Sequence, residues 1–399
     1  MNKLSYLEKL LDGVEVEWRT LGEIAVIYDG THKTPKYTAS GVPFVSVQNI
    51  KNLYGTNKYI SPEDFKTYKN KPRKHDLFMT RIGDVGTCAI VEDDRPLAYY
   101  VTLALIRINQ QIAVPGFIRY LIESRFGKAE LYKRTLIHAV PMKINLGEIG
   151  KVAVPIPCPD NPEKSLAIQS EIVRILDKFT ALTAELTAEL TAELTARKKQ
   201  YNYYRDQLLG FEDGEVEWVV LGNLVDINTG SKPPEIYEKA TDYDYINAGT
   251  SRSGYSDESN CEGDTVTTPS RGQGGIGYVG YQKKPFWLGP LCYKFRAIDE
   301  ELLVNKYLFY FLQSRNELLL SLKKEGGVPA INKSDLVRLE VPVPPLVKQQ
   351  KIVDVLDNFY TLITSITEGL PREIELRQKQ YEYYRDLLFS FPKPDSVTN

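Results

Sequence analysis

The stretch Lys199-Gln200-Tyr201-Asn202-Tyr203-Tyr204-Arg205-Asp206 returns almost unchanged as Lys379-Gln380-Tyr381-Glu382-Tyr383-Tyr384-Arg385-Asp386, 180 residues later. The same offset relates further positions upstream: Gln169 with Gln349, Ile172 with Ile352, and Leu176-Asp177 with Leu356-Asp357. A second echo, offset by 200 residues, pairs Glu15-Val16-Glu17-Trp18 with Glu215-Val216-Glu217-Trp218. The chain is therefore built from two similar halves in tandem, as suits a protein that grips a target with two parts.

Composition narrows the class of protein. The chain has 399 residues, enough for two to four ordinary domains, and 42% of them are hydrophobic. The chain contains no run of about 18 apolar residues that would predict a membrane span, and its N-terminal residues do not resemble a secretion signal. The four cysteines stand singly, which suggests neither a zinc cage nor a disulfide framework and fits a reducing cytoplasm. A net charge of -2 argues against a simple polycation that coats nucleic acid.

Two mixed regions, about 13–157 and 214–344, share one order of elements. Each carries short β-type runs, such as 42–47, 77–80, 98–106 and 152–156 in the first region and 264–268, 291–295 and 339–343 in the second. Each also carries one helical stretch, 115–132 or 305–322, and ends in a Val-Pro-Ile/Val-Pro sequence at 154–157 or 341–344. Proline at these ends predicts an edge strand followed by a linker.

A long helical pattern follows each mixed region. In the first, from about residue 165 to 209, apolar residues recur in steps of three and four: Ile168, Ile172, Ile175, Phe179, Leu182 and Leu186. The second repeats these steps with Ile352, Val355, Phe359, Leu362 and Ile366. This spacing is typical of coiled coils. Gly369-Leu370-Pro371 should kink or interrupt the second helix.

Three identical tetrads, Thr-Ala-Glu-Leu, occupy residues 183–194 of the first helix, and a degenerate copy follows at 195–197. Each tetrad adds about 6 Å of helix and turns its face by about 40°. A tetrad could be added or removed with little change in which face is apolar, so the array is a plausible molecular spacer. The alternative is an ordinary solvated helix made of good helix formers.

These observations predict an α+β fold. Its five parts are a first recognition domain at 1–158, a helical spacer at 159–212, a second recognition domain at 213–344, a second spacer at 345–391 and a tail at 392–399. The same motif, Glu-Val-Glu-Trp, follows both the N-terminal segment and the end of the first helix. The repeats therefore have a circular order, with the two chain ends meeting at one point of the circle. We therefore expect two long antiparallel helices, a coiled-coil spacer, in an arrangement with approximate two-fold symmetry.

Together these features resemble the specificity subunit of a type I DNA restriction-modification system. The segments that carry the resemblance are 12–18, 156–218 and 341–391, and their most specific elements are the tetrad array and the repeated Tyr-Tyr-Arg-Asp motif. The two mixed regions are similar to the family only in layout. The tetrads resemble the subclass that carries tandem Thr-Ala-Glu-Leu repeats, the type IC-like group, in which the number of repeats is tied to the gap between half-sites. Three complete units resemble the longer-gap type.

The resemblance implies a non-catalytic subunit in the cytoplasm that binds double-stranded DNA at a bipartite site, one recognition domain per half. It implies two methyltransferase subunits docked on the helical regions, and restriction or motor subunits that join them. S-adenosylmethionine, ATP and Mg are then expected on those partner subunits, with no cofactor or metal bound by this chain. The alternative from a different class is a tandem coiled-coil scaffold that binds proteins and has no DNA specificity.

The chain's own motifs offer no catalytic site. Residues 272–277 fit the pattern GxGxxG, but the following sequence reads as strand or loop, whereas dinucleotide binding needs a helix there. No phosphate loop of the form GxxxxGK[ST] occurs, and no Asn/Asp-Pro-Pro-aromatic motif of amino-methyltransferases. The three histidines are dispersed. We therefore expect the glycine-rich loop to let the backbone approach DNA.

DNA reading should fall to polar side chains near strand ends and turns, because Arg reads guanine, Asn and Gln read adenine, and Ser, Thr and Lys mostly hold phosphates. The candidates in the first domain are Thr31, Lys33, Thr34, Ser46, Gln48, Asn49, Thr80 and Arg81. Those in the second are Ser231, Lys232, Asn247, Arg252, Ser270, Arg271 and Gln273. For any one of them, a plain solvated residue is the alternative.

The aromatic ends of the two helices are candidates for binding a partner protein, because aromatic residues and arginine anchor many interfaces. The residues concerned are Tyr201, Tyr204, Arg205, Tyr381, Tyr384 and Arg385. The alternative is that these side chains pack the helix ends onto the recognition domains.

Overall fold

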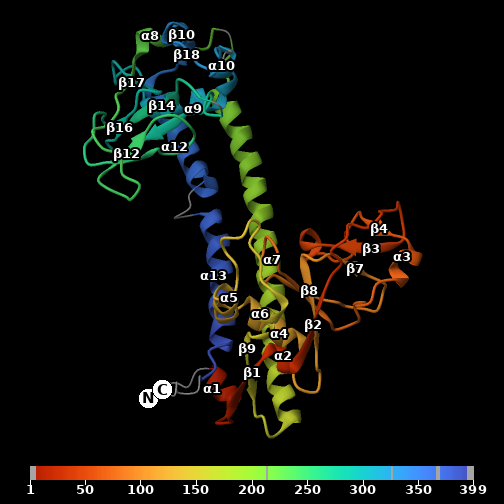
Figure 1. Ribbon diagram of the computed structural model, residues 1–399. Helices are drawn as coiled ribbons and strands as arrows, with labels where there is room; N and C mark the ends of the chain where they lie inside the picture. Colours follow the sequence, from red (N-terminus) through yellow and green to blue (C-terminus); the bar gives the residue numbers. More distant parts are fainter. Residues whose placement is uncertain (1–5, 213, 273, 325–326, 365–368, 393–399) are drawn as a thin grey trace. The chain divides into compact units, whose positions relative to one another are not determined.

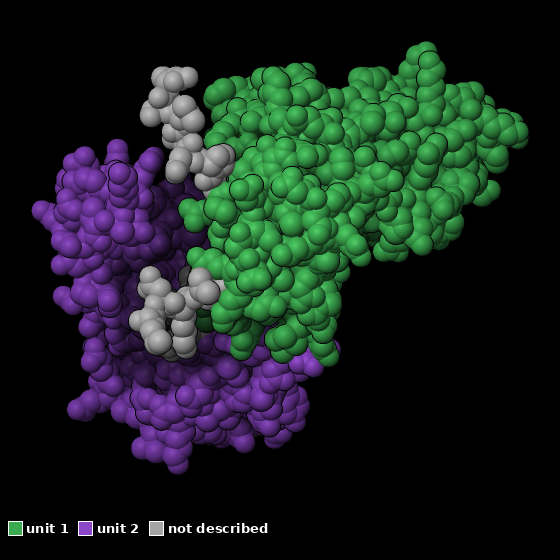
Figure 2. Space-filling model, turned by 90° about the horizontal axis from the view of Figure 1, so that it is seen from below, with its two compact units in different colours: residues 1–188, 375–399 green, residues 189–374 purple. Residues whose placement is uncertain are grey.

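The computed structural model describes residues 6–212, 214–272, 274–324, 327–364 and 369–392. The chain forms two compact units (Figure 2). Unit 1 combines residues 1–188 with the C-terminal residues 375–399, and unit 2 is the continuous stretch 189–374. Each unit thus joins one recognition domain to the helix segments packed against it.

Unit 1 contains three sheets (Figure 1). An antiparallel sheet of four strands has the order β2-β8-β5-β6, a second has the order β4-β3-β7, and β1 pairs with β9 alone. The strands are β1 (Val16–Thr20), β2 (Ala25–Asp29), β3 (Val42–Val45), β4 (Tyr59–Ile60), β5 (Leu77–Thr80), β6 (Cys88–Ile90), β7 (Ala98–Tyr99), β8 (Leu103–Ile108) and β9 (Ala153–Pro157). The helices before the spacer are α1 (Tyr6–Leu11), α2 (Leu21–Ile24), η1 (Val47–Asn49), α3 (Pro62–Lys66), α4 (Pro115–Glu123), α5 (Arg125–Tyr132) and α6 (Leu146–Gly150).

Unit 2 repeats this topology. Its sheets are β11-β17-β14-β15, β13-β12-β16 and the pair β10-β18. The strands are β10 (Glu217–Val220), β11 (Val225–Thr229), β12 (Tyr243–Ile246), β13 (Gly254–Ser256), β14 (Thr265–Pro269), β15 (Gly280–Gln282), β16 (Trp287–Leu288), β17 (Cys292–Ala297) and β18 (Glu340–Val343). The helices are α8 (Leu221–Leu224), α9 (Asn305–Ser314), α10 (Asn316–Ser321) and α11 (Lys333–Leu336). The α+β class and the duplicated mixed domains predicted from the sequence are confirmed.

The central strands of unit 1 are buried on both faces. Because side chains alternate along a strand, Leu77 and Met79 of β5 pack with α4 and the spacer helix, whereas Phe78 packs with the second sheet. All four residues of β5 are buried, which explains the continuous apolar run at 77–80. The four-stranded sheet is thus the middle layer between the helices and the β4-β3-β7 sheet, as Figure 1 shows.

A single helix, α7 (Pro162–Leu209), continues from unit 1 into unit 2. Its 48 residues would span about 72 Å at about 1.5 Å per residue. Pro162 occupies the first position, where its missing N–H costs nothing. The Thr-Ala-Glu-Leu tetrads are helical throughout, and Leu186, Leu190 and Leu194 are half-buried. Leu182 differs from the predicted stripe, because its side chain is 51% exposed.

The second helical region is interrupted as predicted. Helix α12 (Leu346–Thr364) ends before Gly369, whose φ of +84° favours glycine, and α13 (Leu370–Leu388) begins directly after it. The predicted seam is wrong at Val355, which is exposed, whereas Leu356 is fully buried. The reason is that α12 packs on α9 of its recognition domain, so its buried face is turned away from Val355 and includes Ile352, Val353 and Leu356.

Three predicted elements are divided in the structure. The run 98–106 splits into β7 and β8, which belong to different sheets, with a turn at 101–102. The stretch 115–132 breaks into α4 and α5 at Ser124, whose hydroxyl caps α5 by accepting from the Gly127 N–H at 3.1 Å. The stretch 305–322 likewise breaks into α9 and α10 at Arg315. The Val-Pro elements are edge strands, as expected, since β9 and β18 each pair with one neighbour.

The sequence repeat is also a repeat of contacts. Gln169 accepts from the Val114 N–H at 3.0 Å and donates to the Ile112 carbonyl at 3.0 Å. In unit 2, Gln349 accepts from the Val304 N–H at 2.8 Å and donates to the Leu302 carbonyl at 2.9 Å. Both side chains are fully buried. Each long helix is therefore fastened to its recognition domain by the same amide.

None of the helices in the described ranges is both long enough and apolar enough to cross a membrane.

Candidate nucleic-acid interface

The turn after β2 is fixed by close backbone packing. A side chain at Gly30 would collide with the carbonyl of Tyr100. Thr31 donates its N–H to the Tyr99 carbonyl at 3.1 Å, and Val101 donates back to the Thr31 carbonyl at 3.0 Å. In unit 2, Gly230 approaches the backbone of Leu288 in the same way. Each recognition domain thus presents the residues after its glycine from a rigid turn.

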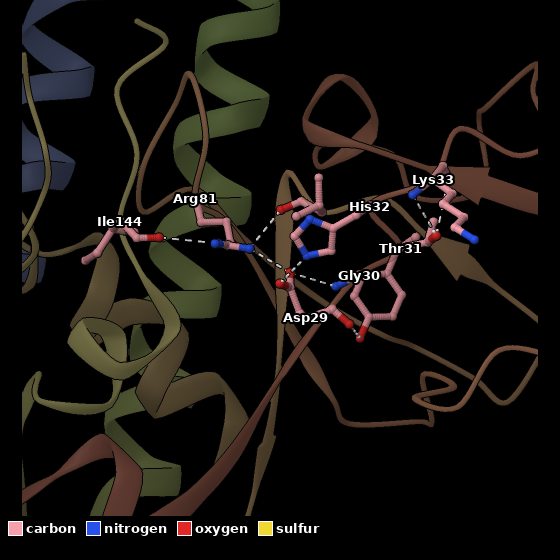
Figure 3. Close-up of polar contacts among 9 residues, drawn as sticks. Asp29, Gly30, Thr31, His32, Lys33, Arg81 and Ile144 are labelled. Carbon is pink, nitrogen blue, oxygen red and sulfur yellow. Dashed lines mark hydrogen bonds and ion pairs between the residues drawn. The ribbon is translucent and has the colours of Figure 1, made fainter. Parts of the chain in front are cut away.

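Arg81 lies inside this turn region and not on its surface (Figure 3). Its guanidinium forms an ion pair with Asp29 at 2.6 Å and donates to the carbonyls of Val101 at 3.2 Å and Ile144 at 3.3 Å. Asp29 also accepts from the Gly30 N–H at 3.0 Å and contacts the ring of His32 at 2.8 Å. The Arg81 side chain thus stabilises the Gly30 turn, which favours a positioning role for this residue over the predicted contact with guanine.

Three further candidates of the first domain also bind their own neighbours. Thr80 is fully buried, and its hydroxyl donates to Asp84 at 3.1 Å. Ser46 and Asn49 cap the short helix η1 reciprocally, since the Asn49 side-chain oxygen accepts from the Ser46 N–H at 3.1 Å. The structure therefore uses these side chains to shape turns.

The other candidates of the first domain are accessible. Gln48 is exposed on η1, and Lys33 and Thr34 are exposed after the Gly30 turn. Thr31 is half-buried, and its hydroxyl accepts from the Lys33 N–H at 3.2 Å. Thr31, Lys33 and Thr34 line one side of a cavity of about 510 Å³. These side chains are free to meet a ligand in that cavity.

The strand ends of the two units align in a way that the sequence did not indicate. Ile144 donates its N–H to the Arg81 carbonyl, and Ile331 donates to the Ser270 carbonyl at the same place in unit 2. Likewise, Gly83 donates to Met142 and Gly272 to Pro329. Ser270 is therefore the structural counterpart of Arg81, and Arg271 the counterpart of Ile82. Since successive side chains point to opposite faces, this shift of one residue leaves Ser270 buried and Arg271 exposed.

The remaining candidates of the second domain vary in exposure. Ser231 and Lys232 are exposed after the Gly230 turn. The Asn247 side chain accepts from the Leu291 N–H at 2.8 Å, and Arg252 pairs with Asp244 at 3.0 Å above the ring of Tyr255. Asn247 and Arg252 line a cavity of about 420 Å³ that α9 and α12 close from the other side. Gln273 lies outside the described residues.

The aromatic motifs make equivalent contacts in each unit. In unit 1, Tyr384 of α13 stacks on Phe179 of α7 with centroids 5.2 Å apart; in unit 2, Tyr204 of α7 stacks on Phe359 of α12 at 5.7 Å. These pairs join antiparallel helix segments within each unit. Arg205 lies 5.7 Å from the Tyr201 ring and binds Asp206, and Arg385 does the same with Tyr381 and Asp386.

Within this set, Tyr201 and Arg385 are buried, so they pack inside their units. The neighbouring Tyr203 and Tyr383 are 62% and 64% exposed, respectively. Both belong to the tyrosine-rich helix ends in which the sequence predicts contacts with a partner protein. They offer a partner more surface than Tyr201 does.

Buried tyrosines strengthen the junctions between helices and recognition domains. Burial raises the pKa of Tyr120, and its hydrogen bond to Asp177 adds to the shift. Burial raises the pKa of Tyr310 in unit 2 in the same way, again with a bond to the matching Asp357. Both phenols stay protonated at neutral pH and act as fixed donors. Within the described ranges, no group of three or more His, Cys, Asp or Glu is arranged to hold a metal ion.

Comparison with known proteins identifies the class. The model of the type I restriction modification DNA specificity domain matches residues 13–196 and again 214–376. The specificity subunit of the type I restriction enzyme EcoR124I/EcoR124II from Escherichia coli is 41% identical, with complete coverage of both chains. The EcoprrI specificity subunit of the same species is 35% identical over 92% of this chain and 93% of that protein.

Solved structures agree on the fold. A structure described as the structural basis of assembly and conformational transition of a type I system superposes with a TM-score of 0.63 at 18% identity, covering 94% of this chain and 97% of that chain. The S subunit from M. genitalium superposes with a TM-score of 0.52 at 16% identity, over 96% and 98% of the two chains.

The duplicated fold and the two family matches define a DNA specificity protein. The chain belongs to the type I restriction-modification specificity subunits. These subunits are the non-catalytic components that recognise DNA sequence, and they assemble with modification and restriction subunits. The alternative of a protein scaffold without DNA specificity is not supported.

Proposed function

We propose that this chain reads a bipartite duplex site, with one recognition domain on each half. The observation that carries the proposal is the duplication of the turn and strand-end framework, in which Gly30 and Gly230 open equivalent turns and Arg81 and Ser270 occupy equivalent positions. A pair of matched frameworks with different exposed side chains suits two short sequences that differ from each other.

Accessible polar residues around these turns are the proposed DNA contacts. In the first domain they are Thr31, Lys33, Thr34 and Gln48, and in the second Ser231, Lys232, Asn247, Arg252 and Arg271. Arg271 is the proposed reader of a guanine, because it is exposed and arginine binds that base through two hydrogen bonds. Replacing Arg271 with alanine should cost on the order of 1–3 kcal/mol of discrimination at one base pair. Equal binding to the matched and mismatched sites by the variant and the parent would reject this assignment.

We further propose that the Thr-Ala-Glu-Leu array acts as a spacer and places the chain in the type IC-like subclass. The support is that the array is helical and lies within one continuous helix that crosses from unit 1 to unit 2. Three complete tetrads would then set the accepted gap between the half-sites.

The proposed assembly contains two methyltransferase subunits, one for each helical region, together with restriction or motor subunits in the cytoplasm. The support is that each unit carries an equivalent exposed pair, Tyr203-Tyr204 or Tyr383-Tyr384. S-adenosylmethionine, ATP and Mg would be bound by those partners.

A methylation map of genomic DNA from cells that carry this chain and its cognate methyltransferase tests the central proposal. The expected result is one methylated motif with two specified parts and a fixed unspecified gap. A single continuous motif would overturn the assignment of one domain to each half. A control strain that expresses the methyltransferase without this chain should lack the motif.

A further inference from the structure

The segment between β2 and β5 in unit 1 and the corresponding segment between β11 and β14 in unit 2 carry opposite charge. From Gly30 to Asp76, between β2 and β5, there are nine Lys or Arg against three Asp or Glu. From Gly230 to Asp264, between β11 and β14, there are three Lys or Arg against eight Asp or Glu. The net charges are therefore +6 and -5, although the whole chain carries only -2.

In unit 1, part of this excess surrounds the cavity beside the Gly30 turn. One wall is the turn itself, with Thr34, Lys33 and Lys36; the other is the segment after α3, with Lys69 and Asn70. The three lysines are exposed. In the ranges that the structure describes, none of these three ammonium groups forms an ion pair with a carboxylate. Two carboxylates, Asp29 and Asp64, also line the cavity, so it offers a net positive charge together with hydroxyl and amide donors.

Other cations of this segment are held by aromatic rings. The Lys58 ammonium lies 5.4 Å from the Tyr37 ring centroid, and the Lys71 ammonium lies 4.9 Å from that of Phe65. A ring orients an ammonium without cancelling its charge. Asp29, the carboxylate at the base of the turn, is already engaged by Arg81. The positive potential of the face is thus preserved.

We infer that this face, defined by Lys33, Lys36 and Lys69 around the cavity, binds the phosphate backbone of duplex DNA, so that the first recognition domain makes most of the chain's phosphate contacts. The occupant is a polyanion because the lysines converge on one hollow with hydroxyl and amide donors between them. The corresponding segment of unit 2 has no matching excess, since it is acidic and its Arg252 is paired with Asp244. The inference rests on the proposed reading of DNA by both domains and adds that the two halves are held unequally.

Salt dependence of binding tests the inference. The full chain, assembled with its methyltransferase subunit, is titrated on a duplex carrying the complete site at salt concentrations from 50 to 200 mM. The variant replaces Lys33, Lys36 and Lys69 with glutamine. Three lost phosphate contacts should lower the slope of log Kd against log salt by about 2.7, so that the ratio of variant to parent Kd shrinks about 40-fold across this range.

A matched control removes the same charge elsewhere in unit 1, through K9Q, K151Q and K164Q, three exposed lysines outside the segment 30–76. This control should keep the parental slope. An unchanged slope in the first variant, or an equal change in both variants, would overturn the inference. Loss of affinity for the methyltransferase subunit with an unchanged DNA slope would show that the face binds protein, which also overturns it.

Uncharged methylphosphonate linkages placed in one half-site at a time test the inequality directly. For the parent, one half should be several-fold more sensitive than the other, and the triple lysine variant should remove this difference. Equal sensitivity in the parent would contradict the inference while leaving bipartite recognition intact. Absence of any two-part methylation motif would instead count against the proposed function.

Discussion

At the scale of the residue, Arg81 shows how a strand end is held. Replacing it with alanine should destabilise the protein by about 3 kcal/mol, because Asp29 would keep a partly buried charge without its partner. Chemical denaturation of the full chain measures this loss. The matched variant R271A should change the free energy of unfolding by less than about 0.5 kcal/mol, since Arg271 is exposed. Equal effects of the two variants would contradict the assigned positioning role.

Why the sequence did not separate these two arginines is a matter of register. Both follow a strand and precede a glycine, so local pattern alone gives them the same role. The structure shows that Arg81 aligns with Ser270, and one step along a strand reverses the side chain's direction. The partner of Arg81, Asp29, lies 52 residues earlier, which no local pattern reveals. By contrast, the exposure of Lys33 and Thr34 followed from the Gly30 turn.

The buried glutamines carry a second prediction at this scale. Replacing Gln169 or Gln349 with leucine should cost about 2–4 kcal/mol, because a backbone N–H and a backbone C=O would each remain buried without a partner. Urea denaturation followed by fluorescence measures the change. Gln350, which is exposed beside Gln349, is the control, and Q350L should leave stability within about 0.5 kcal/mol. A cost below 1 kcal/mol at Gln169 and Gln349 would refute the role of these amides.

At the scale of the element, the spacer helix was predictable because its period is regular. Apolar steps of three and four and the absence of glycine or interior proline predicted 165–209, and the observed helix begins only three residues earlier. The burial of α12 was less predictable, since Val355 and Leu356 are equally apolar neighbours. Only the position of α9 decides which of them is covered.

Removing one tetrad, residues 187–190, should shorten the accepted gap between half-sites and leave the two half-site sequences unchanged. The physical reason is that four residues shorten the helix by about 6 Å and rotate it by only about 40° past a full turn. A methylation map of cells carrying the deletion measures both quantities. Insertion of a single alanine after Leu190 is the control, because it rotates the helix by about 100° and should abolish methylation. An unchanged gap in the deletion would refute the spacer proposal.

Substitutions of the repeated tyrosines can distinguish a role in packing from a role in binding a partner. Tyr203→Ala and Tyr383→Ala should leave the melting temperature unchanged and weaken methyltransferase binding at least tenfold, because exposed aromatic residues are typical interface anchors. Calorimetric titration with the methyltransferase subunit gives the affinity. Tyr204→Ala and Tyr384→Ala remove a stacked pair as well, so they should also cost about 1 kcal/mol of stability. Retained affinity in all four variants would place the partner elsewhere.

At the scale of the whole molecule, unit 1 is assembled from both ends of the chain. Leu7 and Leu11 of α1 share one core with Phe389 and Phe391, which pack on Phe117 of α4. In addition, the Trp18 indole donates to the Pro392 carbonyl at 2.9 Å. In unit 2 the corresponding corner is one continuous stretch, where Phe211 follows α7 directly.

Truncation after Leu387 should therefore damage one unit and spare the other. Losing Leu388, Phe389 and Phe391 uncovers the apolar face of α4, and we expect a fall of several kcal/mol in the stability of unit 1. Limited proteolysis should then cut within residues 6–160 and leave 214–360 protected. Removal of residues 393–399 alone is the control, and both units should then stay protected from the protease. Equal cleavage of the two units would disprove this division.

The order of synthesis gives the mixed origin of unit 1 a biological consequence. Every residue of unit 2 is synthesised before residue 375, so the folding of this unit depends on no segment that is made later. The largest part of unit 1 is made first, but the hydrophobic side of Phe117 stays uncovered until Phe389 and Phe391 have been synthesised. A chaperone that binds nascent chains should therefore stay bound longest to the N-terminal half of this polypeptide.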